Sequence, residues 1–182
     1  MEHLRFPIGH FHAPEMIIPS DIEQWIEDIE KFPMLLTEEL IGLSQEQLEW
    51  SYRPDGWSIR QLTHHCADSH MNSFIRFKLA LTEDKPVIKP YEEALWAKLP
   101  DNESDVTESL FILKGLHARW VQLLKNLSYK DLDREFVHPE NGQTVSVAEN
   151  IGIYAWHGKH HLEHIRLAKG FKGDMAKALE IL

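Results

Sequence analysis

The feature that most constrains the fold of this chain is a helical periodicity of apolar residues, repeated in four long segments. The clearest segment is 105–127, whose stripe is Leu110, Leu113, His117, Trp120, Leu124 and Leu127. Residues spaced alternately three and four apart lie on one face of an α-helix. The other three segments begin near residues 20, 58 and 146. Because each helix must bury its apolar face, the sequence predicts an all-α four-helix bundle.

Three of these helices carry a start signal. A serine is followed three residues later by Glu or Gln, which is the pattern of a capping box, and the serines are Ser20, Ser58 and Ser146. Pro33 lies inside the first segment and should kink or break that helix. The second helix is expected to end near Thr82.

The connection 83–103 contains three prolines and is long enough to cross the bundle. A crossing connection makes the helices that it joins parallel. The sequence therefore predicts up-down-down-up topology, with one helical turn of the connection near 91–99.

Before the last helix, segments 136–138 and 144–146 flank the turn sequence PENG and predict a small β-hairpin. The last helix should end near Lys169, where glycines follow. Residues 1–19 show little periodicity and are expected to form an ordered but irregular arm. The length of 182 residues favours a single domain spanning 1–182.

Composition excludes several classes of protein. The net charge of −10 without a basic cluster disfavours binding to nucleic acid or to an anionic membrane, and no apolar run is long enough to span a bilayer. Cys66 is the one cysteine, so an internal disulfide is excluded and a cytoplasmic location is expected. Histidine is abundant, with 12 of 182 residues, which favours metal or proton chemistry.

The strongest chemical signal is the sequence WHGKHHLEH in the last helix. His157 and His161 are four residues apart, so they lie one turn apart on the same face and can bind one ion. His160 and His164 form a second such pair, and spacing alone does not choose between the pairs. The apolar stripe favours His157 with His161, and places His160 towards the opposite side. Gly158 stands where metalloproteases with an HExxH motif have a glutamate.

A third ligand would have to come from another helix. QLTHHCADSH in the second helix offers His64, His65 and His70. The apolar pattern places His64 towards solvent, His65 at the edge of the buried face and His70 nearer its centre. The pattern leaves the choice between His65 and His70 open.

Three motifs, GWSIRQLTHHCADSHMNSFIRFKL, LHARW and YAWHGKHHLEHI, together resemble the DinB/YfiT-like superfamily and specifically its YfiT-type branch. The resemblance covers nearly the whole chain and implies a four-helix bundle with up-down-down-up topology. It also implies a metal site with one histidine eight residues after the tryptophan of a W-S/T motif and two in an H-x-x-x-H motif. In this sequence these are His65, counted from Trp57, and the pair His157 and His161.

The resemblance further implies an enzyme that acts on small molecules. Three histidines leave an open coordination position on a divalent metal, with zinc expected and nickel the alternative. The favoured reaction is transfer of a low-molecular-weight thiol, such as bacillithiol, to an electrophilic substrate. The alternative is hydrolysis by metal-activated water, which is the usual label of the branch. A third interpretation is a helix bundle in which the metal only holds the helices together and catalyses no reaction.

Two residues outside the motif triad are candidates for a supporting role behind the ligands. His117 lies on the apolar stripe of its helix, where the rival reading is a core histidine hydrogen-bonded to a neighbour. Asp68 lies near the histidines of the second helix, although acidic residues on helices are more often solvated. The branch also implies a homodimer, and sedimentation of a 21 kDa species alone would contradict it.

Overall fold

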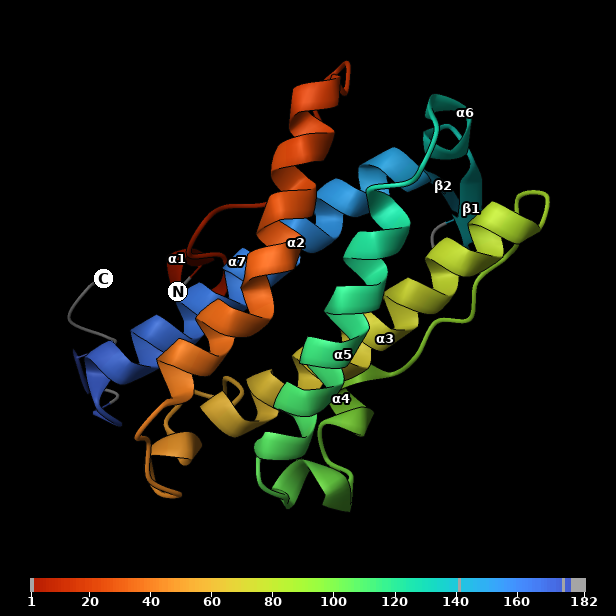
Figure 1. Cartoon of the computed structure of the whole chain (residues 1–182). Coiled ribbons are helices and arrows are strands. Elements are labelled where there is room, and N and C mark those ends of the chain that lie inside the picture. Colours follow the sequence, from red (N-terminus) through yellow and green to blue (C-terminus); the bar gives the residue numbers. More distant parts are fainter. Residues whose placement is uncertain (1, 141, 175, 178–182) are drawn as a thin grey trace.

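The computed structural model describes residues 2–140, 142–174, 176 and 177 and is mainly helical (Figure 1). Its elements are α1 (Glu2–Arg5), α2 (Pro19–Leu40), α3 (Ile59–Thr82), α4 (Glu93–Trp96), α5 (Thr107–Leu124), α6 (Tyr129–Leu132), β1 (Glu135–His138), β2 (Gln143–Ser146) and α7 (Val147–Phe171). Single 3₁₀ turns lie at 47–49 and 100–103.

The long helices α2, α3, α5 and α7 form the bundle (Figure 1). Helices α3 and α5 run in the same direction, and α2 and α7 run in the opposite one, which is the predicted up-down-down-up topology. The connection that carries α4 crosses the bundle between α3 and α5. Helix α7 packs against α2 and α3, and α5 packs against the same two helices from the other side.

The cap predicted for the first helix was wrong by two residues. The helix begins at Pro19, and Ile18 rather than Ser20 occupies the cap. The Ile18 N–H donates to the carboxylate of Asp21 at 3.0 Å, so the expected pairing of Ser20 with Glu23 is not used. Proline suits the first helical position because it has no N–H to satisfy and its φ is already helical.

Of the kink or break expected at Pro33, the break does not occur, because α2 is one continuous helix to Leu40. Phe32 and Leu36, on either side of Pro33, are both buried. Burial of side chains from both halves of α2 holds the helix together and outweighs the backbone hydrogen bond that a proline removes.

The other start signals are confirmed. The Ser58 hydroxyl accepts from the Gln61 N–H at 3.3 Å, and the Gln61 side chain accepts from the Ser58 N–H at 3.1 Å. The hydroxyl of Ser146 accepts from the Glu149 N–H at 3.0 Å. These caps fix where α3 and α7, the helices that carry the histidine motifs, begin.

The hairpin is confirmed, with β1 and β2 antiparallel and Phe136 opposite Val145. Asn141 in its turn lies outside the described residues. Helix α7 continues two residues beyond Lys169, and its end is formed by Lys172 in the left-handed conformation at φ 54°.

The core has two regions, and each draws side chains from α2, α3, α5 and α7. One region contains Trp120, and the other contains Leu36. The predicted apolar stripe of α5 is buried as expected at Leu113, His117, Trp120 and Leu124. Cys66 is buried in the second region, where burial raises the pKa of its thiol, so it serves packing as predicted.

The N-terminal arm, described over residues 2–18, is irregular as expected except for one short helix. It contains the short helix α1, whose Leu4 is buried in contact with Phe171 of α7. The arm therefore lies along α7 (Figure 1).

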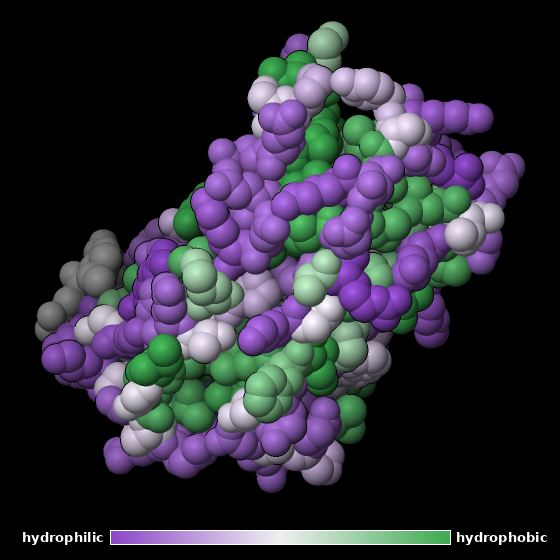
Figure 2. All heavy atoms as spheres, viewed as in Figure 1, coloured by the Kyte–Doolittle hydropathy of each residue, from purple (hydrophilic) through white to green (hydrophobic). Residues whose placement is uncertain are grey.

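The surface is mixed in polarity. Figure 2 shows apolar side chains gathered in areas between polar ones on the viewed face, and Met34 of α2 and Phe111 of α5 are among the exposed apolar residues. Within the described residues, none of the helices combines the length and apolar character that crossing a bilayer requires.

Candidate metal centre

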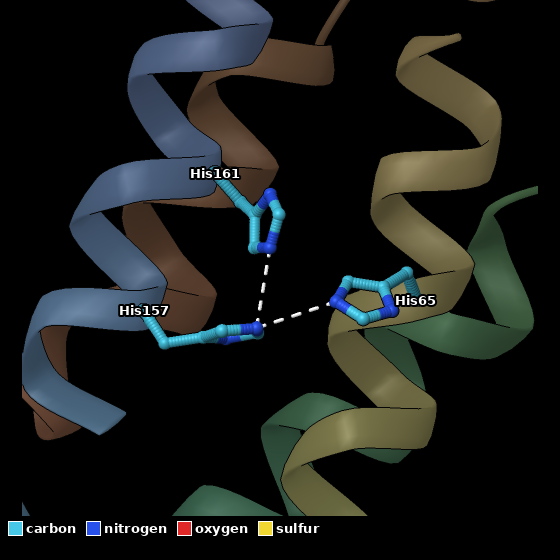
Figure 3. Close-up of side chains that lie close together, drawn as sticks. All are labelled: His65, His157 and His161. Atoms are coloured by element: carbon cyan, nitrogen blue, oxygen red, sulfur yellow. Dashed lines mark hydrogen bonds between the residues drawn. The ribbon is translucent and has the colours of Figure 1, made fainter. Parts of the chain in front are cut away.

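Helices α3 and α7 bring three histidines face to face (Figure 3). His65 lies on the second turn of α3, and His157 and His161 lie on successive turns of α7. The Nε2 atom of His157 is 3.3 Å from Nε2 of His65 and 3.2 Å from Nε2 of His161. The structure thus brings together the three residues that the sequence motifs indicated.

The spacing of these nitrogens fits a metal ion. Ligand nitrogens about 2.0–2.1 Å from zinc in a tetrahedral site are about 3.4 Å from one another. The two measured Nε2 separations are close to that value, and the potential ligand atoms of all three residues lie within 4.8 Å of one another. Imidazole donors suit zinc and nickel. His65, His157 and His161 therefore fit a divalent transition metal with room for a further ligand.

The electrostatic environment keeps these imidazoles neutral. Burial lowers the pKa of His65 to about 4. Burial, together with the neighbouring imidazoles, holds the pKa values of His157 and His161 well below the usual range. Neutral imidazole is the form that binds metal, so the three ligands are ready at neutral pH without losing a proton.

The alternative ligand His70 lies behind the site. Its Nε2 is 3.0 Å from Nδ1 of His157, and its Nδ1 is 2.8 Å from Nε2 of His117. Nδ1 of His117 donates to the backbone carbonyl of Ile29 at 2.6 Å. His117 is thus a hydrogen-bonded core histidine, as one of the two interpretations held, and it also connects to the site through His70.

The expectation that His64 faces solvent was wrong. His64 is buried, with Nδ1 at 2.8 Å from the Ser109 hydroxyl and Nε2 at 3.3 Å from the Ser104 carbonyl. The apolar pattern of α3 missed this because α5 and the end of the crossing connection cover that side. Asp68 is half-buried beside Asp101, and burial raises its pKa to about 6. Within the described residues, no hydrogen bond joins its carboxylate to the site histidines.

The placement of His160 on the outer side of α7 was also wrong. His160 is buried because its ring stacks on Trp156 at 4.5 Å and lies 5.7 Å from Phe6 of the N-terminal arm. His164 contacts the arm as well, since its Nε2 is 3.1 Å from the Arg5 carbonyl. The periodicity of the sequence could not predict that the N-terminal arm covers this side of α7.

His160, His161 and His164 form a second group whose potential ligand atoms also lie within 4.8 Å of one another. Nδ1 of His164 is 3.3 Å from Nδ1 of His161. His161 therefore belongs to both groups, with Nε2 directed to one and Nδ1 to the other.

A cleft of about 310 Å³ opens onto the three histidines. Its other lining residues are two further histidines, His160 and His164, and the aromatic or charged side chains Phe6, Tyr52, Trp57, Trp156, Arg5, Arg53, Asp55 and Glu93. Neither Arg5 nor Arg53 was predicted from the sequence to lie at the site. The position of Arg53 in the RPDG loop just before the W-S motif was the available signal.

A four-helix bundle with three inward-facing histidines defines the class of the protein, and comparison with known proteins gives its family. A model of the DinB superfamily matches residues 28–165. The chain belongs to the DinB superfamily. A protein of Oceanobacillus iheyensis called "Putative metal-dependent hydrolase" is 52% identical over 161 residues, which cover 88% of this chain and 93% of the relative. A Bacillus cereus protein with the same description is 52% identical over 165 residues, covering 91% and 95%.

Solved structures agree with the fold. YfiT from Bacillus subtilis, described as "a probable metal-dependent hydrolase with an unusual four-helix bundle topology", has a TM-score of 0.90 and 40% identity, covering 93% of this chain and 98% of that one. The mycothiol-dependent maleylpyruvate isomerase has a TM-score of 0.63 with 16% identity, covering 82% and 63%, and shares the fold. The chain is thus of the YfiT-like kind that its motifs indicated.

We expect metal-free protein to lose stability in acid through His117. Burial lowers the pKa of His117 to about 4, against about 6.5 in an unfolded chain. Between these values the unfolded state binds more protons, so the stabilising contribution is complete above pH 6.5 and is lost as the pH falls towards 4. Between pH 7 and 5 the loss from His117 should be about 2 kcal/mol.

Urea unfolding of wild type and His117→Phe at both pH values measures this contribution. His70 of α3 and the Ile29 carbonyl of α2 face the His117 ring nitrogens in wild type. The variant should show a smaller drop in the free energy of unfolding, and equal drops would contradict the assignment.

Proposed function

We propose that this protein is a metal-dependent transferase that joins a low-molecular-weight thiol to electrophilic small molecules. The observation that carries the proposal is the ligand set: three neutral histidines, His65, His157 and His161, facing one another beside an open cleft. A divalent metal bound there would act as a Lewis acid that lowers the pKa of a coordinated thiol or water.

The residues around the site suit a thiol substrate. Gly158 occupies the position after the first α7 ligand, so this helix lacks the glutamate base of HExxH enzymes. Attack by a thiol activated in this way needs no such base. Small thiols such as glutathione and bacillithiol carry negatively charged carboxylates. The positively charged side chains of Arg5 and Arg53, which line the cleft, could pair with them.

In the proposed reaction, the thiol sulfur forms a bond to an electrophilic carbon. The bond from that carbon to its leaving group breaks, the leaving group departs with the electron pair, and the thiol proton passes to solvent. The aromatic walls, including Trp57 and Trp156, would pack against the apolar part of the electrophile and limit the entry of water.

Hydrolysis is the second candidate. The descriptions of the relatives favour it, and so does Glu93, a carboxylate that lines the cleft and whose pKa is raised by burial. A carboxylate with a raised pKa is suited to general acid–base catalysis at neutral pH.

A single assay separates the candidates. Zinc-loaded protein is mixed with bacillithiol, glutathione or cysteine and then with monochlorobimane, whose chloride leaves as the fluorescent thioether forms. A parallel series measures hydrolysis of activated esters and amides without thiol. We expect metal-dependent conjugation that is lost in His65→Ala, with the fold of the variant checked by circular dichroism.

The other outcomes have clear meanings. Metal-dependent ester or amide hydrolysis with conjugation at the buffer rate would favour the hydrolase. If the protein binds metal but shows neither activity with these substrates, the result would favour a non-catalytic bundle in which the metal only holds the helices together.

A further inference from the structure

Three imidazoles form a continuous chain that leads away from the candidate metal centre into the core. The chain runs from His157 through His70 to His117, and it ends at the backbone carbonyl of Ile29. The successive distances between the paired atoms are 3.0, 2.8 and 2.6 Å. Across the centre, Nε2 of the ligand His65 lies 3.3 Å from Nε2 of His157. Helices α7, α3, α5 and α2 are thereby joined through one series of side chains.

The end of this chain determines where every proton lies. A carbonyl oxygen only accepts, so His117 must carry its proton on Nδ1. A neutral ring then presents a lone pair on Nε2, which accepts from the Nδ1–H of His70. His70, neutral and protonated on Nδ1, likewise has a lone pair on Nε2, which accepts from the Nδ1–H of His157. His157 is left with its Nε2 lone pair pointing at His65 and His161.

These proton positions require neutral rings, and burial keeps the rings neutral. His70 and His117 are both buried. Burial and the neighbouring imidazoles hold the pKa of His70 well below its usual range, and burial lowers that of His117 to about 4.

A shorter chain acts on the other α7 ligand. Nε2 of His164 lies 3.1 Å from the Arg5 carbonyl and must donate to it, so Nδ1 of His164 is an acceptor. That acceptor is 3.3 Å from Nδ1 of His161, which therefore carries a proton. His161, like His157, is left with its lone pair on Nε2, directed at the centre.

We propose that His70, His117 and His164 are positioning residues that fix the tautomer and ring orientation of the two α7 metal ligands by anchoring them to the backbone carbonyls of Ile29 and Arg5. This inference rests on the proposed metal site for its consequence, although the chains themselves are features of the protein alone. Hydrogen bonds from the far nitrogen of a ligating imidazole hold the ring in place and raise its basicity.

The same tautomers argue against a second ion in the group His160, His161 and His164. A proton on Nδ1 of His161 points at His164 and occupies the place where that ion would take a lone pair. The structure thus assigns His164 to support of the first site, and predicts one metal per chain rather than two.

Substitution of His70 tests the longer chain. His70→Leu removes both hydrogen bonds, and His70→Gln keeps a donor and an acceptor. Zinc affinity is measured by competition with a chromophoric chelator, and the cobalt-loaded absorption spectrum reports ligand geometry. We expect His70→Leu to lower the affinity about 10- to 100-fold and change the spectrum, and His70→Gln to restore most of both.

His64→Leu is the matched control. His64 is a buried histidine of the same helix whose ring nitrogens pair with Ser109 and Ser104, outside the chain. It should lose fold stability as His70→Leu does, while keeping wild-type zinc affinity and cobalt spectrum. Equal affinity in wild type and His70→Leu, or equal weakening in His64→Leu, would overturn the proposal.

A second measurement needs no variant. Nitrogen NMR of protein labelled with ¹⁵N-histidine reports which ring nitrogen carries the proton, in metal-free and zinc-loaded samples. We expect Nδ1–H in His70 and His117 and Nε2–H in His164, whether or not metal is present. Opposite tautomers, or two zinc ions per chain, would contradict the inference. Correct tautomers in a chain that binds no zinc would instead refute the metal site and the proposed function while the hydrogen-bonded chains stand.

Discussion

Replacement of His157 by alanine is expected to remove nearly all of the metal from protein loaded with zinc. His157 is the middle member of the group, because its Nε2 lies within 3.3 Å of Nε2 of both His65 and His161. Without it, the two remaining imidazoles lose the ligand between them, and two ligands hold zinc far less firmly than three. Metal analysis after gel filtration gives the occupancy.

His160→Ala is the control for the choice of helix face. His160 lies one turn from His157, is buried, and stacks on Trp156 rather than facing His65. It should retain about one zinc per chain. Full occupancy in His157→Ala with loss in His160→Ala would show that the wrong face of α7 had been chosen.

Chelation of the metal is expected to lower the thermal midpoint of unfolding by about 10 °C. A ligand that binds only the folded state stabilises it by about 4 kcal/mol when its free concentration is 1,000 times its Kd. For a chain of this size, each kcal/mol corresponds to about 2–4 °C. Differential scanning calorimetry of zinc-loaded protein, with and without excess chelator, measures the shift.

The same scans on His157→Ala give the necessary comparison. Because that variant should hold little zinc, chelator should leave its midpoint almost unchanged. A shift as large as that of wild type would show that metal stabilises the protein from some other place.

The bundle was predictable because its signals are local and repeat along the chain. The alternation of apolar residues in α5 and the caps at Ser58 and Ser146 each fix one helix without reference to the rest. The start of α2 was missed because Pro19 and Ser20 offer competing signals side by side, and the proline prevailed.

The candidate site was predictable only in part. Helical spacing paired His157 with His161, but it left His65 and His70 undecided, and the family motif supplied that choice. Both residues are buried, so burial could not separate them. The two residues differ in which nitrogen of His157 they approach. Nε2 of His65 lies near Nε2 of His157, at the centre, whereas Nε2 of His70 lies near Nδ1 of His157, on the far side of the ring. This difference depends on how α3 packs against α7.

The errors at His64 and His160 share a physical cause. Helical periodicity reports one buried face, whereas α3 and α7 are each covered on more than one side. The covering segments, the crossing connection over His64 and the N-terminal arm over His160, are irregular and carry no periodic signal.

The separation of the ligands along the chain also has a consequence for how the protein folds. His65 and His157 are 92 residues apart, and the helices α3 and α7 must pack before their nitrogens meet. Contacts between distant residues form late, because closing so long a loop costs entropy before it gains anything. Metal should therefore join after most of the native structure has formed. An interaction absent from the folding transition state slows unfolding and leaves the folding rate unchanged, so zinc should lengthen the lifetime of the native state without hastening its formation.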